Sequence, residues 1–473
     1  MRANGTSVRT EGLTAMGVVA DDGGVILLDR NSITTLGTTS IGLYSTVEQS
    51  GPQFPAGIVG ERLVVETFGT GAHGAMAVEH FLPADSTILL DDSLLTTHGD
   101  LASDLRSVMS ASIDARNSVI LTQGDRSSGL HSRDNGSEIN LIDTTVTTEG
   151  TASHGALAEG GGLVNGLRTS VEAKGSDSYA LYVAGAAGFV SEARFDASRL
   201  SNADGPAIAI GGEGVVSLTG SVVSSSGQWL SVGTIADFQP LTVPDAGLGG
   251  VTDPEGLETS SVFTPPAALP VVPGLANVTL SRSVVTGAAF TAPGSVSNLV
   301  LEDDSLWNMT GSSNLTTLLN DPSLIQFSAP TGDPTLLASY MTLTVVDYVG
   351  EDGNIGLNTY LDTDGSPSDR IVIDGGSATG TSGLIISNTT GGGALTTGNG
   401  ILVVDAINGG VTDPAAFHLA APAAAGLTTT CSSGAASTAQ VRRTGTCVPS
   451  LSVHRTQRRS IARKSRSMRQ FHP

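Results

Sequence analysis

The chain has 473 residues, of which 39% are hydrophobic and 4% aromatic, and it contains 60 glycines. It carries 45 acidic and 23 basic side chains, a formal net charge of −22. A strongly acidic surface repels nucleic acid and anionic lipid, so we expect neither as a partner. No stretch is long and apolar enough to predict a membrane-spanning helix. The hydrophobic residues recur with a period, which argues against a disordered chain despite the many glycines.

Charge and cysteine are concentrated at the C-terminal end. Residues 427–473 contain nine basic and no acidic side chains, so the preceding 426 residues carry 14 basic and 45 acidic ones. Both cysteines, Cys431 and Cys447, also lie in this tail. The opening Met1-Arg2-Ala3-Asn4 leads straight into repeats with no apolar signal segment. We therefore expect a fragment that begins within a longer repeat array and needs no disulfide.

A short phrase occurs seven times in the first 181 residues: an apolar residue, then in most copies Thr-x-Gly, then a small residue and usually a second glycine. The anchoring glycines are 25, 32, 30, 25, 26 and 25 residues apart. They are Gly12, Gly37, Gly69, Gly99, Gly124, Gly150 and Gly175. A repeat period of 20 to 50 residues is typical of a solenoid, in which each unit buries its apolar face against its neighbours.

Each copy of the phrase predicts a strand, a turn and a second strand. The position four residues before the anchoring glycine is apolar and mostly β-branched, as in Ile33 and Val65, and the position six residues after it is apolar, as in Leu43. The second glycine is replaced by Asp104 and Ala180 in two copies. We attribute its recurrence to a corner with positive φ, which glycine adopts without a steric penalty. The phrase as a whole predicts an all-β coil of parallel strands around an aliphatic core.

The phrase decays after residue 181, although strands continue, for example over Val215–Leu218 and Val278–Leu280. Residues 240–273 contain seven prolines. Proline cannot donate a ladder hydrogen bond, so this segment predicts a loop that projects from the coil. A recognition role and a passive insertion are both open for it.

Residues 297–425 resume strands and carry a series of motifs in a characteristic order. The motifs are Ser305–Gly311, Ser313–Leu315, Met341–Val345, Ser368–Ile373 and Gly409–Phe417. This segment resembles the C-terminal module of pertactin-like autotransporter passengers, and the upstream repeats are similar to the β-helix of the same family. The predicted domains are therefore repeats over 1–239, the loop with return strands over 240–296, the module over 297–425 and a tail over 426–473.

The resemblance implies a fold and a role. Such passengers are right-handed parallel β-helices whose C-terminal module caps the helix and serves as a folding template. They are displayed at the cell surface or outside the cell, act in adhesion or host contact, and attach to the outer membrane through a β-barrel. We expect a non-catalytic protein whose partner is a host-cell surface or extracellular-matrix ligand, with no cofactor.

The chain departs from the family pattern after Gly426. An aromatic strand, a linker and a β-barrel are expected there, but Leu427–Ser432 and an arginine-rich end follow instead. We hypothesise that a single-base deletion near codon 426 produced an out-of-frame tail. The alternative for the tail is a nucleic-acid or membrane-binding arm. For the chain as a whole, a non-functional pseudogene product is an alternative.

No residue pattern predicts a catalytic or metal site. Gly175-Ser176-Asp177-Ser178 has a superficial likeness to a serine-protease motif, but it occupies a repeat corner. The histidines lack metal-ligand spacing, and His98 and His154 stand at variable repeat positions that predict solvent exposure.

Acidic residues offer two further candidates. The pairs Asp91-Asp92 and Asp303-Asp304 lie at strand ends, where at least one side chain of each meets water. A β-helical polysaccharide-degrading enzyme remains an alternative and requires carboxylates gathered on consecutive coils. Asp362–Asp369 has carboxylates spaced like a calcium loop, but it lacks the terminal glutamate and reads equally well as a turn.

Overall fold

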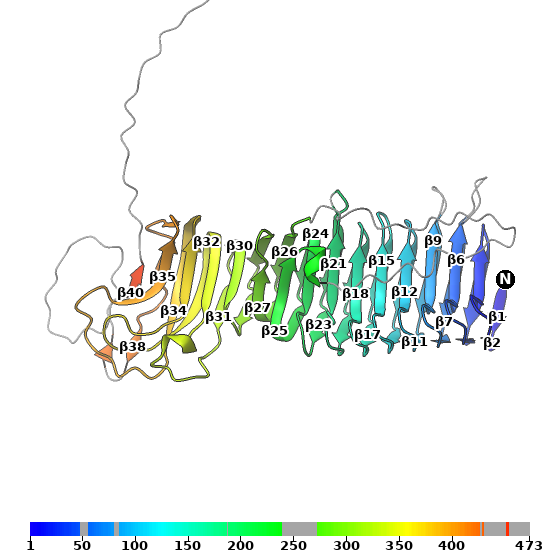
Figure 1. Cartoon of the computed structure of the whole chain (residues 1–473), viewed down its shortest axis with the longest axis horizontal. Helices are drawn as coiled ribbons and strands as arrows, with labels where there is room; N and C mark the ends of the chain where they lie inside the picture. The colour runs from blue at the N-terminus through cyan, green and yellow to red at the C-terminus, as the bar shows by residue number, and fades with distance from the viewer. Residues whose placement is uncertain are drawn as a thin grey trace, which may run out of the picture.

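The computed structural model describes residues 1–47, 55–79, 85–186, 188–238, 272–425, 428–429 and 451–453. Its strands stack side by side into one elongated rod, with the N-terminus at one end and β34 to β40 at the other (Figure 1). The regular structure of these residues is otherwise limited to two 3-10 helices, η1 (Ile235–Phe238) and η2 (Leu337–Ser339). No helix in the described ranges has the length and apolar character needed to cross a membrane. The prediction of an all-β solenoid is confirmed.

The first coils consist of three short strands each. The strands are β1 (Arg2–Asn4), β2 (Ser7–Thr10), β3 (Val18–Asp21), β4 (Val25–Asp29), β5 (Ser32–Thr35), β6 (Leu43–Val47), β7 (Ala56–Glu61), β8 (Val64–Thr67), β9 (Ala75–Glu79), β10 (Ser86–Asp91), β11 (Leu94–Thr97), β12 (Ser103–Val108), β13 (Ser112–Arg116), β14 (Val119–Thr122), β15 (Ser128–Arg133), β16 (Glu138–Ile142), β17 (Thr145–Thr148), β18 (His154–Glu159), β19 (Leu163–Leu167), β20 (Ser170–Ala173) and β21 (Leu181–Gly185).

The later strands are longer and continue the stack. They are β22 (Ser191–Asp196), β23 (Arg199–Asn202), β24 (Ile208–Thr219), β25 (Val222–Gly233), β26 (Leu275–Ser281), β27 (Val284–Thr291), β28 (Val296–Glu302), β29 (Leu306–Met309), β30 (Ser313–Asn320), β31 (Leu324–Phe327), β32 (Thr342–Thr359), β33 (Arg370–Asp374), β34 (Ser377–Asn388), β35 (Ile401–Ile407), β36 (Val411–Thr412), β37 (Phe417–Leu419), β38 (Ala424–Ala425), β39 (Thr428–Thr429) and β40 (Leu451–Val453).

Successive coils pair in parallel and in register. One column runs through Ile26, Ile58, Ile88, Ile113 and Ile139, which are partners along β4, β7, β10, β13 and β16. Because side chains alternate between the two faces of a strand, a one-residue slip would turn this whole column outward. The regular apolar pattern therefore specifies the register of the stack. The right-handed sense of the coil stays a prediction.

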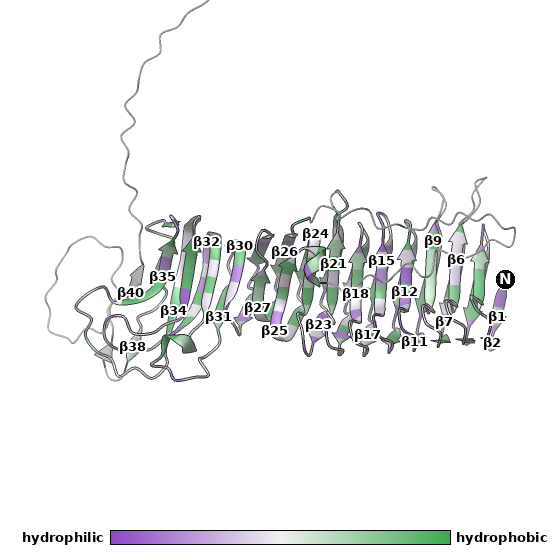
Figure 2. Ribbon diagram, viewed as in Figure 1, coloured by the Kyte–Doolittle hydropathy of each residue, from purple (hydrophilic) through white to green (hydrophobic). Residues whose placement is uncertain are grey.

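The predicted apolar positions form the core. From the second copy onward, those four residues before the anchoring glycine are fully buried: Ile33, Val65, Leu95, Ile120, Val146 and Val171. Those six residues after it are buried equally well: Leu43, Ala75, Leu105, Leu130, Ala156 and Leu181. Full burial of a Val, Leu or Ile side chain contributes about 1.5–3 kcal/mol. Hydrophobic and hydrophilic residues are interleaved along the strands over the whole rod (Figure 2), so the core runs its full length.

The anchoring glycines line up coil above coil, as predicted, but for a different reason from the one expected. A Cβ on Gly37 would lie 1.8 Å from the carbonyl oxygen of Gly12, and a Cβ on Gly69 would lie 2.0 Å from that of Gly37. The second glycine is equally confined, because a Cβ on Gly42 would lie 2.5 Å from the carbonyl oxygen of Gly74. None of these glycines has positive φ. Close backbone stacking, and not a left-handed corner, requires glycine here.

The left-handed corner lies two residues after the anchoring glycine. It is occupied by Thr14, Thr39, Gly71, Leu101, Arg126, Ala152 and Asp177, all with φ between 51° and 66°. Only one of these residues is a glycine, so the positive-φ position could not be recognised from a recurring residue type in the sequence. The repeat does contain a positive-φ corner, as predicted, but it lies two residues after the anchoring glycine and not at the second glycine.

The stack continues across the proline-rich segment: β24 pairs with β26 without a register shift, whereas the pairing of β25 with β27 shifts between Ser224 and Leu230. Glu213–Thr219 of β24 pairs in parallel with Leu275–Ser281 of β26. Residues 239–271, and with them nearly all of the predicted projecting loop, lie outside the described residues, as does most of the tail over 426–473. The proposed domain boundaries stay predictions.

Two tryptophans join the largely aliphatic core where the stack approaches its C-terminal third. Trp229 of β25 and Trp307 of β29 are fully buried and meet edge to face, with ring centroids 6.1 Å apart. The indole nitrogen of Trp307 donates a hydrogen bond of 2.9 Å to the carbonyl oxygen of Gly287. Trp307 belongs to the first C-terminal motif, so this motif supplies the base on which the later strands stack.

Candidate functional site

The motifs of the C-terminal segment come together in one packed module. β30 pairs with β28 and with β32, and β32 in turn pairs with β33 and β34. β37 then closes against β34. The strands of this module are continuous with the upstream coils, because β30 pairs with β28 on its N-terminal side.

Asp369 is the polar centre of this module. Its carboxylate accepts hydrogen bonds of 2.8 Å from the backbone N–H of Met341, from the backbone N–H of Asn358 and from the side-chain amide of Asn358. Asn358 also donates to the carbonyl oxygens of Phe327 and Ser328. Burial raises the pKa of the Asp369 carboxyl, which these donors oppose. The carboxylate thereby joins the Met341 and Ser368 motifs, and the pattern of the sequence identified Asp369 but not its partner Asn358.

A second buried contact joins β30, β32 and β34. The Tyr348 hydroxyl lies 2.6 Å from the Ser382 hydroxyl, and the Asn320 side-chain amide donates to Tyr348 at 3.4 Å. The Tyr348 ring stacks on Phe417 of the last motif, with centroids 5.2 Å apart. Burial raises the pKa of the Tyr348 phenol, so the side chain remains a neutral hydrogen-bonding group.

The segment spaced like a calcium loop is used by the chain itself. Asp364 accepts hydrogen bonds from the backbone N–H groups of Gly400, Thr397 and Gly398 at 2.6, 2.8 and 3.0 Å, and these bonds lower the pKa of its carboxyl. Asp369 is directed into the buried contact with Asn358 instead. The two carboxylates therefore do not converge. Within the described ranges no three His, Cys, Asp or Glu side chains are placed to hold a metal ion.

The residues of the serine-protease-like motif, Gly175–Ser178, make contacts between neighbouring coils. Ser178 is fully buried, accepts a hydrogen bond from the backbone N–H of Ser153, and donates to the carbonyl oxygen of Gly150. Asp177 occupies the left-handed corner position. No base is hydrogen-bonded to the Ser178 hydroxyl among the described contacts, so this motif belongs to the stacking of the coils.

The histidines do not all lie where the repeat pattern placed them. His98 is partly exposed and stacks on Phe68, with centroids 4.3 Å apart. His154 is fully buried, which corrects the expectation of a solvated side chain. Its Nδ1 accepts a hydrogen bond from the backbone N–H of Tyr179, and burial lowers its pKa to about 3. The outer face of β18 is covered, and the repeat pattern reports only the inner face.

A buried ionisable cluster lies on this covered face. His131 of β15 approaches Glu159 of β18, with Nε2 and Oε2 3.0 Å apart, and His73 accepts the backbone N–H of Ser103. Burial lowers the pKa of both imidazoles. A neutral His131 can donate its Nε2 proton to the Glu159 carboxylate, which joins two adjacent coils.

The acidic pairs are exposed and do not lie on neighbouring coils. Asp91 and Asp92 end β10, which pairs with β7 and β13, whereas Asp303 and Asp304 follow β28, which pairs with β26 and β30. Carboxylates do form a row on consecutive coils at Asp29, Glu61 and Asp91, which are register partners. Arg62 bonds Asp29 at 2.5 Å and also Glu61, and the Asn117 amide donates to Asp91 at 2.9 Å.

One lateral face carries an apolar stripe. Val64, Leu94 and Val119 are register partners at the start of β8, β11 and β14, and they are 40%, 39% and 47% exposed. The same register position is Thr145 and Ser170 in the next two coils. We call Val64, Leu94 and Val119 the lateral stripe. Exposed apolar patches of this kind mark contact surfaces more often than isolated residues do.

The geometry defines the class first: a parallel β-solenoid that ends in a distinct, densely hydrogen-bonded C-terminal module. Residues 313–428 match the family model described as Autochaperone Domain Type 1. This domain is characteristic of autotransporter passenger domains such as pertactin, so the resemblance found in the sequence is confirmed. The match covers the motifs from Ser313 to Phe417 and begins after the motif that contains Trp307.

Proposed function

We propose that this chain is an autotransporter passenger displayed at the cell surface, where it acts in adhesion or host contact without catalysis. The autochaperone match carries the proposal, because such a module accompanies passengers that fold outside the cell. Residues 313–428 act in it as the folding template, and the coils upstream supply the binding surface. The partner is a host-cell surface or extracellular-matrix ligand.

The lateral stripe supports a binding role for the rod. Three aliphatic side chains from consecutive coils form a continuous strip, while the equivalent positions in the following coils are polar. Such a strip gains free energy when a ligand removes it from water, at about 25 cal/mol per Å² of apolar surface. The strip is rigid because every strand beneath it is paired on both sides.

A binding assay with matched variants tests this proposal. The purified chain is applied to cultured host cells and to immobilised matrix proteins, alongside the triple variant Val64→Thr, Leu94→Thr, Val119→Thr. Threonine occupies this register position naturally at Thr145, so the fold should tolerate it. We expect at least a tenfold loss of binding in the triple variant and none in Val222→Thr, an exposed residue of the same register further along the rod. Equal binding by all three proteins would reject the lateral stripe.

A polysaccharide-degrading enzyme is the second candidate, and the row of Asp29, Glu61 and Asp91 is the observation in its favour. Two of these carboxylates are bound to Arg62, which leaves Asp91 as the candidate acid. Turnover of an acidic polysaccharide by the purified chain, lost in Asp91→Asn, would favour this function over adhesion. We expect no turnover.

A further inference from the structure

A ladder of hydroxyl groups runs along one corner of the rod from the fourth coil into the C-terminal module. Each member stands at the corner, one residue before a coil's second strand. The members are Ser93, Ser118, Thr144, Thr169, Ser198, Ser221, Ser283, Ser305 and Ser323, and we call them the corner hydroxyl ladder.

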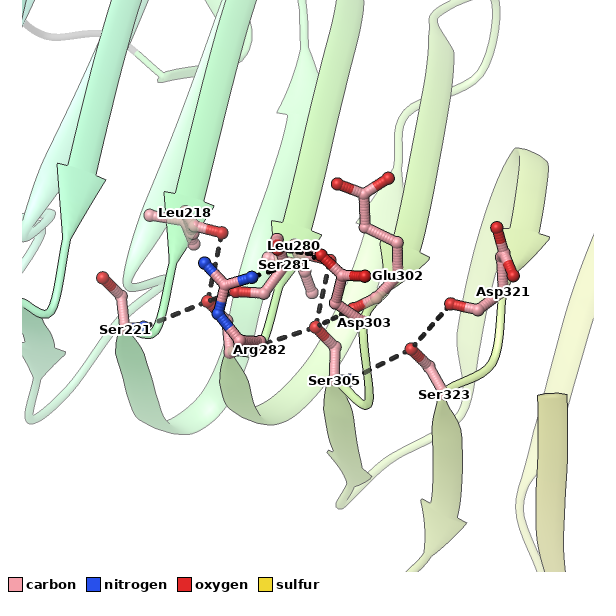
Figure 3. A network of polar contacts seen from close by, with 11 residues as sticks. Leu218, Ser221, Leu280, Ser281, Arg282, Glu302, Asp303, Ser305, Asp321 and Ser323 are labelled. Carbon is pink, nitrogen blue, oxygen red and sulfur yellow. Dashed lines mark hydrogen bonds and ion pairs between the residues drawn. The ribbon is translucent and has the colours of Figure 1, made fainter.

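The ladder has a direction. The backbone N–H of Ser221 donates to the hydroxyl of Ser283 at 3.0 Å, that of Ser283 to Ser305 at 3.1 Å, and that of Ser305 to Ser323 at 3.1 Å (Figure 3). In every case the hydroxyl belongs to the coil on the C-terminal side. The coils joined by these bonds therefore rely on their C-terminal neighbours to accept the backbone N–H at the corner, and the described contacts include such a bond at every step of the ladder except from Thr144 to Thr169.

The hydroxyls also donate hydrogen bonds to carbonyl oxygens of the preceding coil. Ser283 donates to the carbonyl oxygen of Leu218 at 3.1 Å, and Ser305 donates to that of Leu280 at 3.0 Å. Each hydroxyl thus accepts an N–H of the preceding coil and shares its one proton between a C=O of that coil and a C=O of its own corner, Ser281 at 3.0 Å for Ser283 and Glu302 at 2.8 Å for Ser305. Both contacts with the preceding coil are made only when that coil lies in the native register, since a slip of one residue exchanges the two faces of a strand.

These contacts are buried. Ser221, Ser283 and Ser305 are each at most 1% exposed. A buried N–H without an acceptor is strongly unfavourable, because it has lost its hydrogen bond to water and gained none. A coil that docks out of register at this corner therefore leaves the N–H groups of Ser221 and Ser283 without these acceptors, whereas the Ser305 N–H also has the Glu302 carbonyl oxygen of its own corner at 3.2 Å.

The ladder ends inside the autochaperone region. Ser323 lies within the matched range 313–428, and Ser305 lies just before it. A second series of hydroxyls provides a contrast. The N–H groups of Ala102, Ser127 and Ser153 donate to the hydroxyls of Ser127, Ser153 and Ser178, but this series ends at Ser178, where Asn202 caps the Ser178 carbonyl.

We propose that the corner hydroxyl ladder is the register template through which the C-terminal module directs the folding of the coils. The module presents the hydroxyl of Ser323, the next coil docks when its Ser305 N–H finds that hydroxyl, and Ser305 then presents its own hydroxyl to Ser283. Folding proceeds from the C-terminal to the N-terminal coils, one rung at a time. This inference rests on the proposed role of residues 313–428 as a folding template.

Refolding of the full chain tests the proposal. The wild-type chain, Ser305→Ala, Ser305→Thr and Ser153→Ala are diluted from denaturant, and protease-resistant fragments are identified by mass spectrometry over time. Ser305→Ala should delay protection of residues before 305 by about tenfold while residues 313–425 are protected at the wild-type rate. Ser305→Thr should restore the rate, since the Thr144 hydroxyl accepts the Ser118 N–H and donates to the Ala115 carbonyl oxygen at the equivalent rung.

The control separates templating from ordinary stabilisation. Ser153→Ala removes an equivalent buried hydroxyl from the second series, so it should lower the denaturation midpoint similarly but leave the refolding of the other coils unchanged. If Ser305→Ala and Ser153→Ala refold equally fast, the proposal is overturned. If Ser305→Ala does not fold at all, Ser118→Ala should still confine its delay to residues before 118, and a uniform delay in it would overturn the proposal.

The wild-type time course distinguishes the two failures. If protection in the wild-type chain does not begin in residues 313–425, the module is no folding template and the proposed function fails in that part. If protection begins there but Ser305→Ala behaves as wild type, only the ladder is rejected.

Discussion

The carbonyl oxygen of Gly124 lies directly against the α-carbon of Gly150 in the next coil, so that a Cβ on Gly150 would be 2.1 Å from it. The same contact recurs along the rod, from Gly12 beneath Gly37 to Gly150 beneath Gly175. The distance between coils at this corner is therefore set by two backbones with no side chain between them. This contact explains why the anchoring glycine does not vary through seven repeats.

Gly150→Ala should destabilise the rod at this corner. The added methyl group has no space, and overpacking of this kind costs about 1–3 kcal/mol. Chemical denaturation should show a lower midpoint for the variant. Gly227→Ala is the matched control, because a methyl group on Gly227 would have no neighbouring atom within 4 Å and the residue has no positive φ. Equal midpoints for the two variants would contradict the stacking argument.

His154→Asn should flatten the acid side of the stability profile. Burial lowers the His154 pKa from 6.5 to about 3, so the folded state holds a neutral imidazole that the unfolded chain protonates. The associated stability is complete above pH 6.5 and is lost as the pH falls toward 3, by about 1.4 kcal/mol per pH unit. The asparagine oxygen can still accept the Tyr179 N–H.

The measurement is the free energy of unfolding at several pH values between 7 and 3. His418→Asn, which changes an exposed imidazole, should retain the wild-type slope. An unchanged slope in His154→Asn would mean that His154 is not the group responsible.

The contribution of Asp104 to stability should depend on pH in the opposite sense to that of His154, and Asp104→Asn tests it. Asp104 replaces the second glycine of its repeat, and burial raises the pKa of its carboxyl well above 3.8. Its contribution to stability is complete below pH 3.8 and is lost as the pH rises toward the folded-state pKa. A neutral amide can still accept the Thr122 hydroxyl, which lies 2.8 Å from Asp104. The variant should therefore be more stable than the wild type at pH 7, and urea denaturation at pH 4 and 7 should show the difference growing with pH.

Asp369→Ala should selectively loosen the C-terminal module. It leaves the backbone N–H groups of Met341 and Asn358 without their acceptor, and a buried donor that loses its acceptor costs about 1–3 kcal/mol. The Asn358 side-chain amide keeps the carbonyl oxygens of Phe327 and Ser328 as acceptors. Limited proteolysis should open residues 313–425 before the upstream coils. Asp374→Ala removes only an exposed contact with Asn408, and its digestion pattern should match the wild type. Identical patterns for both variants would show that Asp369 does not hold the module together.

The repeat pattern was sufficient to predict the coil. Apolar positions four before and six after each glycine face the core, and parallel pairing follows because each coil meets an equivalent coil on either side. The corner hydroxyl ladder also had a signal in the sequence: Ser93, Ser118, Thr144 and Thr169 each stand six residues before an anchoring glycine. Its meaning depended on knowing that an N–H of the preceding coil lies opposite each hydroxyl.

Periodicity alone established the architecture of this protein, because residues that recur at a fixed spacing in a stacked coil must occupy equivalent environments. Only the tertiary structure revealed why glycine recurs, why His154 is buried and that Asp369 is hydrogen-bonded to Asn358. Those outcomes depend on the distance between coils and on what covers the outer face of a strand, and neither is encoded in the spacing of residues along the chain.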